Sequence, residues 1–334
     1  MNECAKCVVG DLVVAMTNAR ISCGSCIGVN MHDPEEVKKI VETLNSISNL
    51  WAVLDFKRYD KRVSALIWRL IIEYIMEFYR NRPVEENNIR RNFLKGLSEA
   101  YIIVFIDGEF HLIHVESGLV SGLLITSIVG SLGNMIAQYL ALMFLVDPDW
   151  VTKPVADANK VADLVHSRSA SLVYGDDTLL ACTLDGFSVN ALASIIEDKF
   201  GMIVTNEVES ELPSGCVEFR EAIFLARQFD IIDVDGKDCY IAKLRLVSIM
   251  KQLMYDKDTT SKEEIYLKWK NAIGELSLHD KRTYDHYMSI MLPAMQSLGF
   301  DHVIGSQHDV RLEALSVPFV AGEYIMAADD VSSD

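Results

Sequence analysis

The uncharged run over residues 117–146 constrains the fold of this chain more than any other feature of its sequence. A run of this length could cross a bilayer as a helix. Its polar residues recur at helical spacing, however, on one face of the predicted helix: Ser127, Ser131, Asn134 and Gln138. A polar stripe that faced lipid would be costly. We therefore predict a buried helix that lines a polar site, and no transmembrane span.

The composition is that of a globular protein with a substantial core, because half of the 334 residues are apolar and 24% are charged. The net charge of −17 counts against a free-standing nucleic-acid binder, since such proteins usually carry a basic surface. The N-terminus does not resemble a secretory signal, and the seven cysteines are an odd number. We therefore expect reduced thiols in an intracellular setting.

Apolar periodicity and turn residues predict alternating helices and strands. Helices are predicted over residues 33–46, 63–78, 117–146 and 188–200, and in most of the chain past 236. Strands are predicted over residues 50–54, 101–106, 110–115, 171–174 and 177–180, and residues 83–92 are predicted to form a polar connection. This order indicates an α+β sheet domain followed by a mainly helical C-terminal unit.

Three carboxylates lie at a predicted strand end and a predicted hairpin turn. Asp55 follows a predicted strand, and Asp176 and Asp177 lie at a hairpin tip whose first turn position, Gly175, favours glycine. Adjacent carboxylates repel each other unless a cation compensates. Ligands that are all oxygen favour Mg²⁺ or Mn²⁺ over zinc, and two such ions could clamp the oxygens of a phosphoryl transfer. Taken alone, the Gly-Asp-Asp tripeptide could also be a solvated turn.

The motifs around these carboxylates resemble those of the viral RNA-dependent RNA polymerases, specifically the picornavirus-like group. In the order of that family, residues 55–60 resemble motif A, 121–126 motif B, 174–177 motif C and 224–227 motif E. Residues 26–30 and 272–279 also resemble segments of these polymerases. Each motif is short, so the joint order of the motifs makes the resemblance specific.

The resemblance implies template-directed RNA synthesis, in which a nucleotidyl group passes from an NTP to an RNA 3′-hydroxyl and a viral RNA genome is replicated. It implies a polymerase palm, which is an antiparallel sheet backed by helices, with partial fingers and a mainly helical thumb. Residues 1–50 would form partial fingers and the entry to the palm. Residues 51–235 would form the palm, with a fingers insertion near 80–118, and residues 236–334 the thumb.

The family also implies roles for the matching positions. Asp55, Asp176 and Asp177 would be the catalytic ligands of Mg²⁺ or Mn²⁺. The positions implied in substrate binding are Asp60, Ser121, Gly122, Thr126, Asn134 and Arg227. Among these, Asp60 would read the ribose 2′-hydroxyl, which distinguishes RNA from DNA. Arg227 would touch the primer strand, and the motif B residues would hold the template and the ribose.

The sequence departs from the family pattern at several positions. Motif B usually has Asn four residues after its Thr, where this chain has Gly130. Asn134, one turn further on, is the candidate substitute, so sugar selection is left open. Motif D usually supplies a Lys as proton donor, but residues 205–210 hold glutamate instead. Motif E has Ala226 where Lys is usual.

The expected partners are an RNA template and primer, NTPs and other viral replication proteins. Only Lys6 and Arg20 precede residue 38, so the basic fingers motif is expected upstream, in a longer parent chain. The expected setting is the cytoplasm of an infected host cell, including replication complexes associated with membranes.

Four N-terminal cysteines give a competing signal. Cys4 and Cys7 form one CxxC pair, and Cys23 and Cys26 form another, at a separation that matches a four-cysteine zinc site. Structural Zn²⁺ is therefore a second candidate cofactor. The alternative interpretation is four reduced, partly buried cysteines.

Two other functions compete with RNA synthesis. A reverse transcriptase would carry a Tyr-x-Asp-Asp box, which residues 174–177 satisfy. Asp60 argues against it, because a DNA polymerase typically blocks the 2′-hydroxyl with a bulky side chain. The other rival is a non-catalytic scaffold, either stapled by zinc or decayed from a polymerase, which the departures in motifs B and D and the acidic balance would explain.

Overall fold

The computed structural model describes residues 2–115, 117–119, 125–205, 215–254, 261–300 and 304–316. The chain forms two compact units. The first comprises residues 1–29 and 42–218, and the second comprises residues 30–41 and 219–334. The sequence-based division at 235/236 therefore falls inside the second unit, which also includes a short N-terminal segment.

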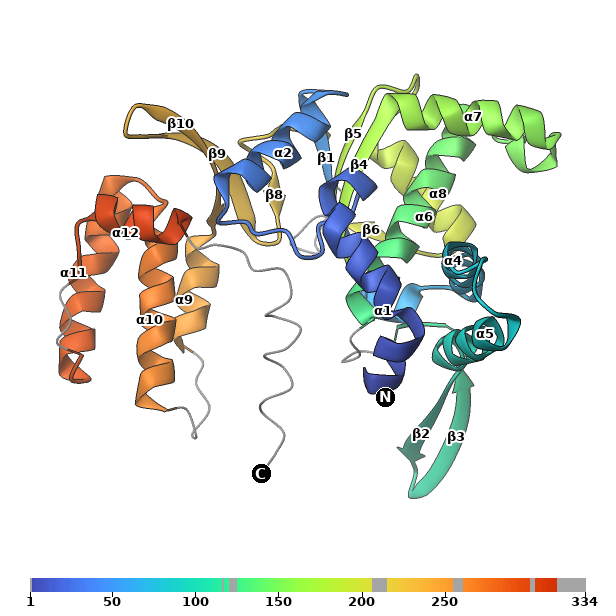
Figure 1. Cartoon of the computed structure of the whole chain (residues 1–334), viewed down its shortest axis with the longest axis horizontal. Coiled ribbons are helices and arrows are strands. Elements are labelled where there is room, and N and C mark those ends of the chain that lie inside the picture. The colour runs from blue at the N-terminus through green and yellow to red at the C-terminus, as the bar shows by residue number, and fades with distance from the viewer. Residues whose placement is uncertain are drawn as a thin grey trace. The chain divides into compact units, whose positions relative to one another are not determined.

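The first unit contains a sheet packed against helices (Figure 1). Its helical segments are α1 (Asn2–Ala19), η1 (Arg20–Cys23), α3 (Tyr59–Arg62), α4 (Ala65–Phe78), α5 (Val84–Ser98), α6 (Thr126–Val146), η2 (Trp150–Thr152), α7 (Val155–Arg168) and α8 (Val189–Phe200). Its strands are β1 (Leu50–Phe56), β2 (Ala100–Ile106), β3 (Glu109–Val115), β4 (Ser169–Tyr174), β5 (Asp177–Cys182), β6 (Val204–Thr205) and β7 (Val217–Glu218).

The main sheet has the strand order β4-β5-β1-β6, and β7 also pairs with β1. All of these pairings are antiparallel, and the β1–β5 register places Leu54 opposite Thr178. The buried side chains of β1 and β5 form a single core with those of α4, α6 and α8, so helices back one face of the sheet. This arrangement confirms the predicted α+β palm architecture, an antiparallel sheet backed by helices.

Local sequence signals set several helix ends. The Asp33 carboxylate accepts a hydrogen bond of 2.9 Å from the Glu35 N–H at the start of α2 (Pro34–Asn45). The Ser64 side chain caps α4, and the Ser188 side chain caps α8. Helix α8 ends at Gly201, which adopts a left-handed conformation with φ +71°. These helices were all predicted.

The predicted polar connection over residues 83–92 is wrong, because helix α5 begins at Val84. Arg90 occupies a buried position on this helix. Its guanidinium lies 4.2 Å from the centre of the Tyr79 ring, and its Nε donates to the Val8 carbonyl at 2.9 Å. The prediction failed because Arg90 interrupts the apolar periodicity on the inward face of α5. Its aliphatic stem nevertheless packs there as an apolar side chain would.

Helix α6 forms from the uncharged run. By length and composition alone it could cross a membrane, and it is the one such helix among the residues described. Two thirds of its most apolar window is nevertheless buried inside the protein. Ser131, Asn134 and Gln138 of the polar stripe are buried as well, as expected for a helix that lines a polar site.

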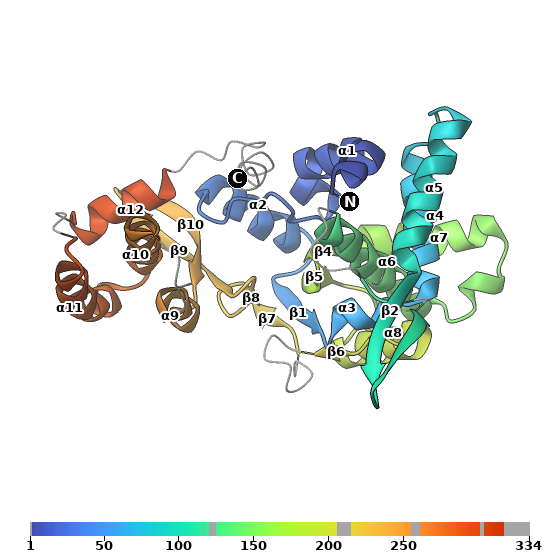
Figure 2. The same ribbon diagram turned by 90° about the horizontal axis from the view of Figure 1, so that it is seen from below.

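Strands β2 and β3 form a separate two-stranded ribbon, which extends from the end of α5 away from the main sheet (Figures 1 and 2). Its tight turn, Asp107-Gly108, has positive φ at both positions, as the sequence predicts. Cross-strand pairs place five exposed apolar side chains on one face of this ribbon: Tyr101, Ile103, Phe105, Phe110 and Leu112.

The second unit combines a small sheet with helices. Its strands are β8 (Ile223–Phe224), β9 (Arg227–Val234) and β10 (Lys237–Leu244), in the order β10-β9-β8. Its helices are α9 (Leu246–Met254), α10 (Lys262–Ser277), α11 (Lys281–Ser297) and α12 (Gln307–Leu315), and α2 begins in this unit. The mainly helical region thus starts at Leu246 rather than near Gly236, because β9 and β10 form a hairpin first.

Candidate active site

The three predicted carboxylates lie at adjoining ends of β1 and β5. Asp55 and Asp177 each lie one residue beyond the last β1–β5 pair, Leu54 with Thr178. Side chains alternate between the faces of a sheet, and Leu54 and Thr178 are both buried on the helix side. Asp55 and Asp177 therefore belong to the opposite face, where both are partly exposed. Asp176 is exposed in the turn between β4 and β5.

The side chains of these carboxylates do not form a complete metal-ligand group. Across the described ranges, no group of three or more His, Cys, Asp or Glu side chains lies close enough to hold a metal ion. The Asp55 carboxylate instead accepts a hydrogen bond of 2.7 Å from the Phe56 N–H. Like charges repel without a cation between them. The chemistry of the three donors, all carboxylates, fits a hard divalent cation such as Mg²⁺, although the present spacing of these side chains does not form a complete ligand group.

Side chains of α6 anchor the β4–β5 turn from the buried face. The Ser131 hydroxyl accepts from the Gly175 N–H at 2.8 Å. The Asn134 amide nitrogen lies 3.0 Å from the Gly175 carbonyl oxygen and 3.1 Å from that of Asp176. Asn134 and Gln138 also reach the Thr178 hydroxyl, at 3.0 and 2.8 Å. The predicted polar stripe therefore supports the backbone that carries two of the three carboxylates.

Tyr59 connects α6 to the same site. Its ring is buried, and its hydroxyl donates to the Gly130 carbonyl at 2.5 Å. Burial, together with the negative charge of Asp176, raises the pKa of Tyr59, so the phenol remains a neutral donor. A Cβ added to Gly130 would lie 3.7 Å from the Cα of Gly175, so the helix passes directly beneath the turn.

The predicted ribose-binding residue, Asp60, is exposed on the short helix α3. Its carbonyl accepts from the Leu119 N–H at 2.5 Å, and the Gly118 N–H donates to the Val63 carbonyl at 2.8 Å. The backbone leading into motif B is therefore tied to motif A. Ser121 and Gly122 lie outside the described residues. Thr126 is the half-buried first residue of α6.

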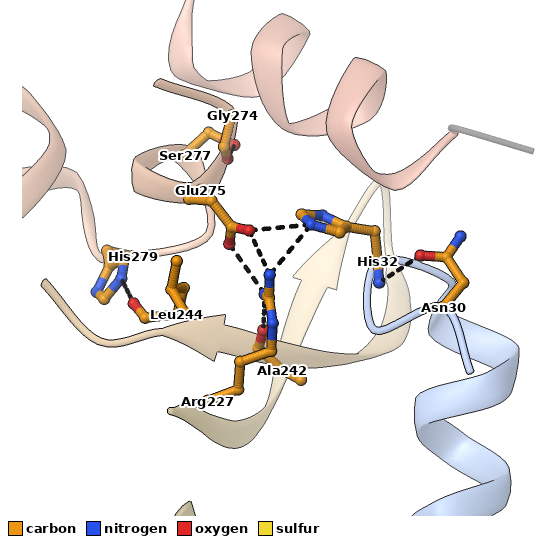
Figure 3. A network of polar contacts seen from close by, with 9 residues as sticks. All are labelled: Asn30, His32, Arg227, Ala242, Leu244, Gly274, Glu275, Ser277 and His279. Atoms are coloured by element: carbon orange, nitrogen blue, oxygen red, sulfur yellow. Dashed lines mark hydrogen bonds and ion pairs between the residues drawn. The ribbon is translucent and has the colours of Figure 1, made fainter. Parts of the chain in front are cut away.

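Arg227, the predicted primer contact, makes its contacts inside the second unit (Figure 3). One guanidinium nitrogen donates to Glu275 Oε2 at 3.0 Å and to the Ala242 carbonyl at 2.8 Å, and the other donates to Glu275 Oε1. His32 Nε2 lies 3.0 Å from the same carboxylate oxygen. Both members of the ion pair are largely buried, with 13% of the Arg227 side chain and 8% of the Glu275 side chain exposed.

Burial opposes the ionisation of Glu275, but the hydrogen bonds and charges of His32 and Arg227 outweigh it, so the pKa of Glu275 is lowered. Arg227 follows a two-residue turn between β8 and β9, in which Leu225 and Ala226 have φ +54° and +58°. Such a turn normally takes Asn and Gly, so motif E holds its arginine beside a strained backbone.

The predicted zinc site is not supported. Cys4 and Cys7 are exposed on α1, whereas Cys26 is buried. The Cys23 thiol lies 3.1 Å from the Arg20 carbonyl. Within the described residues, which include all four cysteines, no group of three or more His, Cys, Asp or Glu side chains could hold a metal ion. The CxxC spacing was misleading because α1 runs as a continuous helix through Cys4 and Cys7, and no knuckle forms there.

Sequence reasoning missed two residues of the site. Tyr59 lies between the two aspartates of motif A, and only its burial against α6 shows that it matters. Thr178 follows Asp177 on β5, and strand alternation could have placed it on the opposite face. No sequence signal links Thr178 with Gln138, because that contact joins segments far apart in the chain.

Comparisons with known proteins agree with this architecture. Residues 1–296 match the model of the viral RNA-dependent RNA polymerase family. The chain is 25% identical over 255 residues to the genome polyprotein of Human parechovirus 2 (strain Williamson), covering 76% of this chain and 10% of the polyprotein. It is 24% identical over 289 residues to the RNA1 polyprotein of Broad bean wilt virus 2, covering 84% of this chain and 14% of the polyprotein.

A solved structure shows the same fold. The Sicinivirus 3Dpol RNA-dependent RNA polymerase superposes with a TM-score of 0.69 at 15% identity. The superposition covers 93% of this chain and 60% of the Sicinivirus chain, so this chain spans only part of each of these relatives. Because the family model matches most of its residues, the chain belongs to the viral RNA-dependent RNA polymerase family.

Proposed function

We propose that this chain carries the catalytic centre for template-directed RNA synthesis, with NTPs as substrates and an RNA 3′-hydroxyl as acceptor. The observation that supports this most directly is the common open face of Asp55 and Asp177, next to Asp176 in an anchored turn. Membership of the polymerase family supports the same reaction.

Asp55, Asp176 and Asp177 would hold two Mg²⁺ or Mn²⁺ ions. When bound, such ions supply positive charge to the attacking and leaving oxygens of a nucleotidyl transfer. The chain itself contributes the fixed positions of the carboxylates. The buried face excludes water beneath the turn, since Leu54 and Thr178 are each 1% exposed. The polar stripe of α6 satisfies the turn's backbone groups.

Asp60 is the proposed reader of the ribose 2′-hydroxyl, because its carboxylate is exposed and its backbone is tied to the segment before motif B. Ser121, Gly122 and Thr126 are proposed to hold template and ribose, on the strength of the family resemblance alone. The buried ion pair of Arg227 favours a supporting role for this residue over direct contact with the primer.

The proposed setting is an infected host cell, as the viral polyproteins among the relatives suggest. Association with other viral replication proteins and with membranes remains a prediction.

The test is primer extension on an RNA template, with wild type and Asp176→Asn compared at several concentrations of Mg²⁺ and Mn²⁺. We expect extension by wild type only, and a preference for NTPs over dNTPs that weakens in Asp60→Ala. Extension with dNTPs alone would identify a reverse transcriptase. Equal signals from wild type and Asp176→Asn at every metal concentration would rule out the proposed activity for this chain.

A further inference from the structure

The β4–β5 turn is anchored through three consecutive peptide groups. The Ser131 hydroxyl takes the Gly175 N–H, and the Asn134 amide reaches the carbonyls of Gly175 and Asp176. These peptide groups lie on both sides of Asp176 and lead directly into Asp177. Fixing these planes fixes the direction in which the Cα–Cβ bond of Asp176 leaves the backbone, and for Asp177 the strand pairing with Tyr174 completes the constraint.

Asn134 is itself held in one orientation. Gln138 Nε2 donates to Asn134 Oδ1, and it also donates to the Thr178 hydroxyl at 2.8 Å. The two amide hydrogens of Asn134 are shared among the two turn carbonyls and the Thr178 hydroxyl, which lies 3.0 Å from Asn134 Nδ2. Ser131 and Asn134 are both 0% exposed, so water does not compete with the turn for their hydrogen bonds. Among the described residues of this network, Gln138 Oε1 is the one buried atom without a hydrogen-bond partner, and every bond that orients Asn134 is made.

The burial of Asn134 counts against the sugar-binding role that the family resemblance suggested for it. A side chain with no exposed surface, whose amide is committed to the turn, is not available to a nucleotide sugar.

We propose that Asn134, assisted by Ser131, is a positioning residue that sets the separation of the Asp176 and Asp177 carboxylates from Asp55, and thereby sets the affinity of this site for divalent cations. The inference rests on the proposed function. It differs from that function in assigning a role to two residues that touch neither metal nor nucleotide.

The experiment measures Mn²⁺ binding to the free protein, without RNA or NTP, by calorimetry, and then primer extension as a function of Mn²⁺ and NTP concentration. The variants are Asn134→Ala and Ser131→Ala. Asn87→Ala is the matched control, because the Asn87 amide also donates to two backbone carbonyls, at 3.0 and 3.3 Å, but away from the carboxylates. Thermal melting confirms that each variant is folded.

We expect Asn134→Ala to weaken Mn²⁺ binding by about 10- to 100-fold, the usual effect of removing a group that orients metal ligands. Ser131→Ala should weaken it less, and Asn87→Ala should leave it unchanged. The kcat of Asn134→Ala should fall and recover in part at high Mn²⁺, whereas the KM for NTP should change little. Because a metal that binds only the folded state also stabilises it, thermal melting without metal separates this effect from a loss of folding.

The outcomes separate the two proposals. If wild type binds Mn²⁺ and Asp176→Asn does not, but folded Asn134→Ala and Ser131→Ala bind it as wild type does, the positioning role is wrong and the proposed function stands. If wild type neither binds Mn²⁺ nor extends a primer, the proposed function fails and the positioning role falls with it. Should Asn134→Ala not fold, Ser131→Ala alone decides between the first two results.

Discussion

Gly118 lies where the backbone leading into motif B meets α3, and its conformation suits no other residue. Its φ is +92°, a backbone angle that residues with a side chain rarely adopt. An added Cβ would lie 2.9 Å from the Asp60 carbonyl oxygen. Its own carbonyl accepts from the Trp68 indole N–H at 2.7 Å, so the backbone cannot move away without losing that bond.

Gly118→Ala is therefore expected to lower the free energy of unfolding by about 2–4 kcal/mol, the sum of backbone strain and steric overlap. Gly108→Ala is the matched control, since Gly108 has φ +87° and no atom within 4 Å of the added Cβ. It should cost only the strain, about 1–2 kcal/mol. Denaturant unfolding measures both, and equal losses would show that the contact with Asp60 is relieved by other means.

The buried Arg227–Glu275 pair gives a second prediction at the residue scale. Arg227→Met would leave the Glu275 carboxylate buried without its main partner, so we expect a loss of about 3–5 kcal/mol in the free energy of unfolding. Arg227→Met combined with Glu275→Leu should recover most of it, because no uncompensated charge remains. A double variant as unstable as the single one would argue against this account.

Among the elements, the loop after α10 holds a histidine with a perturbed pKa. Burial lowers the pKa of His279, and the hydrogen bond of 2.9 Å from its Nε2 to the Leu244 carbonyl only partly offsets this. The charged groups that act on it are Lys243, Asp280 and Glu275. His279 is therefore neutral in the folded protein at pH values where the unfolded chain is protonated.

Because the folded pKa lies below the unfolded one, the unfolded state binds more protons and stability falls as pH drops below about 6.5. We expect the melting temperature of wild type to fall between pH 7.5 and 5.5, and His279→Gln, which cannot titrate, to show a flatter profile. This window lies above the titration of Glu275, whose pKa is lowered. Parallel profiles would assign the pH dependence to other groups.

The β2–β3 ribbon carries a cluster of exposed apolar side chains. Phe110 is 77% exposed and Leu112 is 66% exposed, on the same face as Ile103. Unpaired strand edges and apolar faces of this kind promote association between chains.

Replacing Phe110 and Leu112 together by Thr, which keeps a high strand propensity, should therefore reduce concentration-dependent association in sedimentation experiments. Val155→Thr, at a residue 76% exposed on α7, is the control and should change nothing. Association that persists in the double variant would place its cause elsewhere on the chain.

At this scale the sequence was informative wherever a local signal sufficed. The glycine at the first turn position predicted the β4–β5 tip, and Asp33, Ser188 and Gly201 marked helix ends. The sequence failed at α5, where the aliphatic stem of Arg90 replaces an apolar residue. Periodicity counts residue types, so it cannot detect a charged side chain that is paired and buried.

For the molecule as a whole, the division into units could not be predicted, because it depends on contacts between distant segments. Residues 30–41 belong to the second unit although residues 42–218 of the first unit follow them. The contact of His32 with Glu275, and the ion pair that buries Arg227, lie within the second unit. The three carboxylates were proposed from family motifs, which are local, whereas only packing shows that Tyr59 and Thr178 contact α6.

Native-state hydrogen exchange tests this division. The amides of Val37 and Ile40, both buried on α2, should lose protection together with those of β9 and α10 as denaturant is added. Amides of β1 form the comparison, since they belong to the first unit. Exchange of Val37 and Ile40 in step with β1 instead would show that the segment follows its neighbours in sequence.

The second unit is built from two separate segments of the chain, and this has a consequence for its synthesis. On a ribosome, the segment 30–41 emerges early, and the remainder of its unit emerges only after the whole palm-like sheet has been made. Until then the segment lacks the contacts that the rest of its unit supplies. The time taken to translate residues 42–218 is therefore the shortest interval for which the segment 30–41 waits for its partners in the second unit.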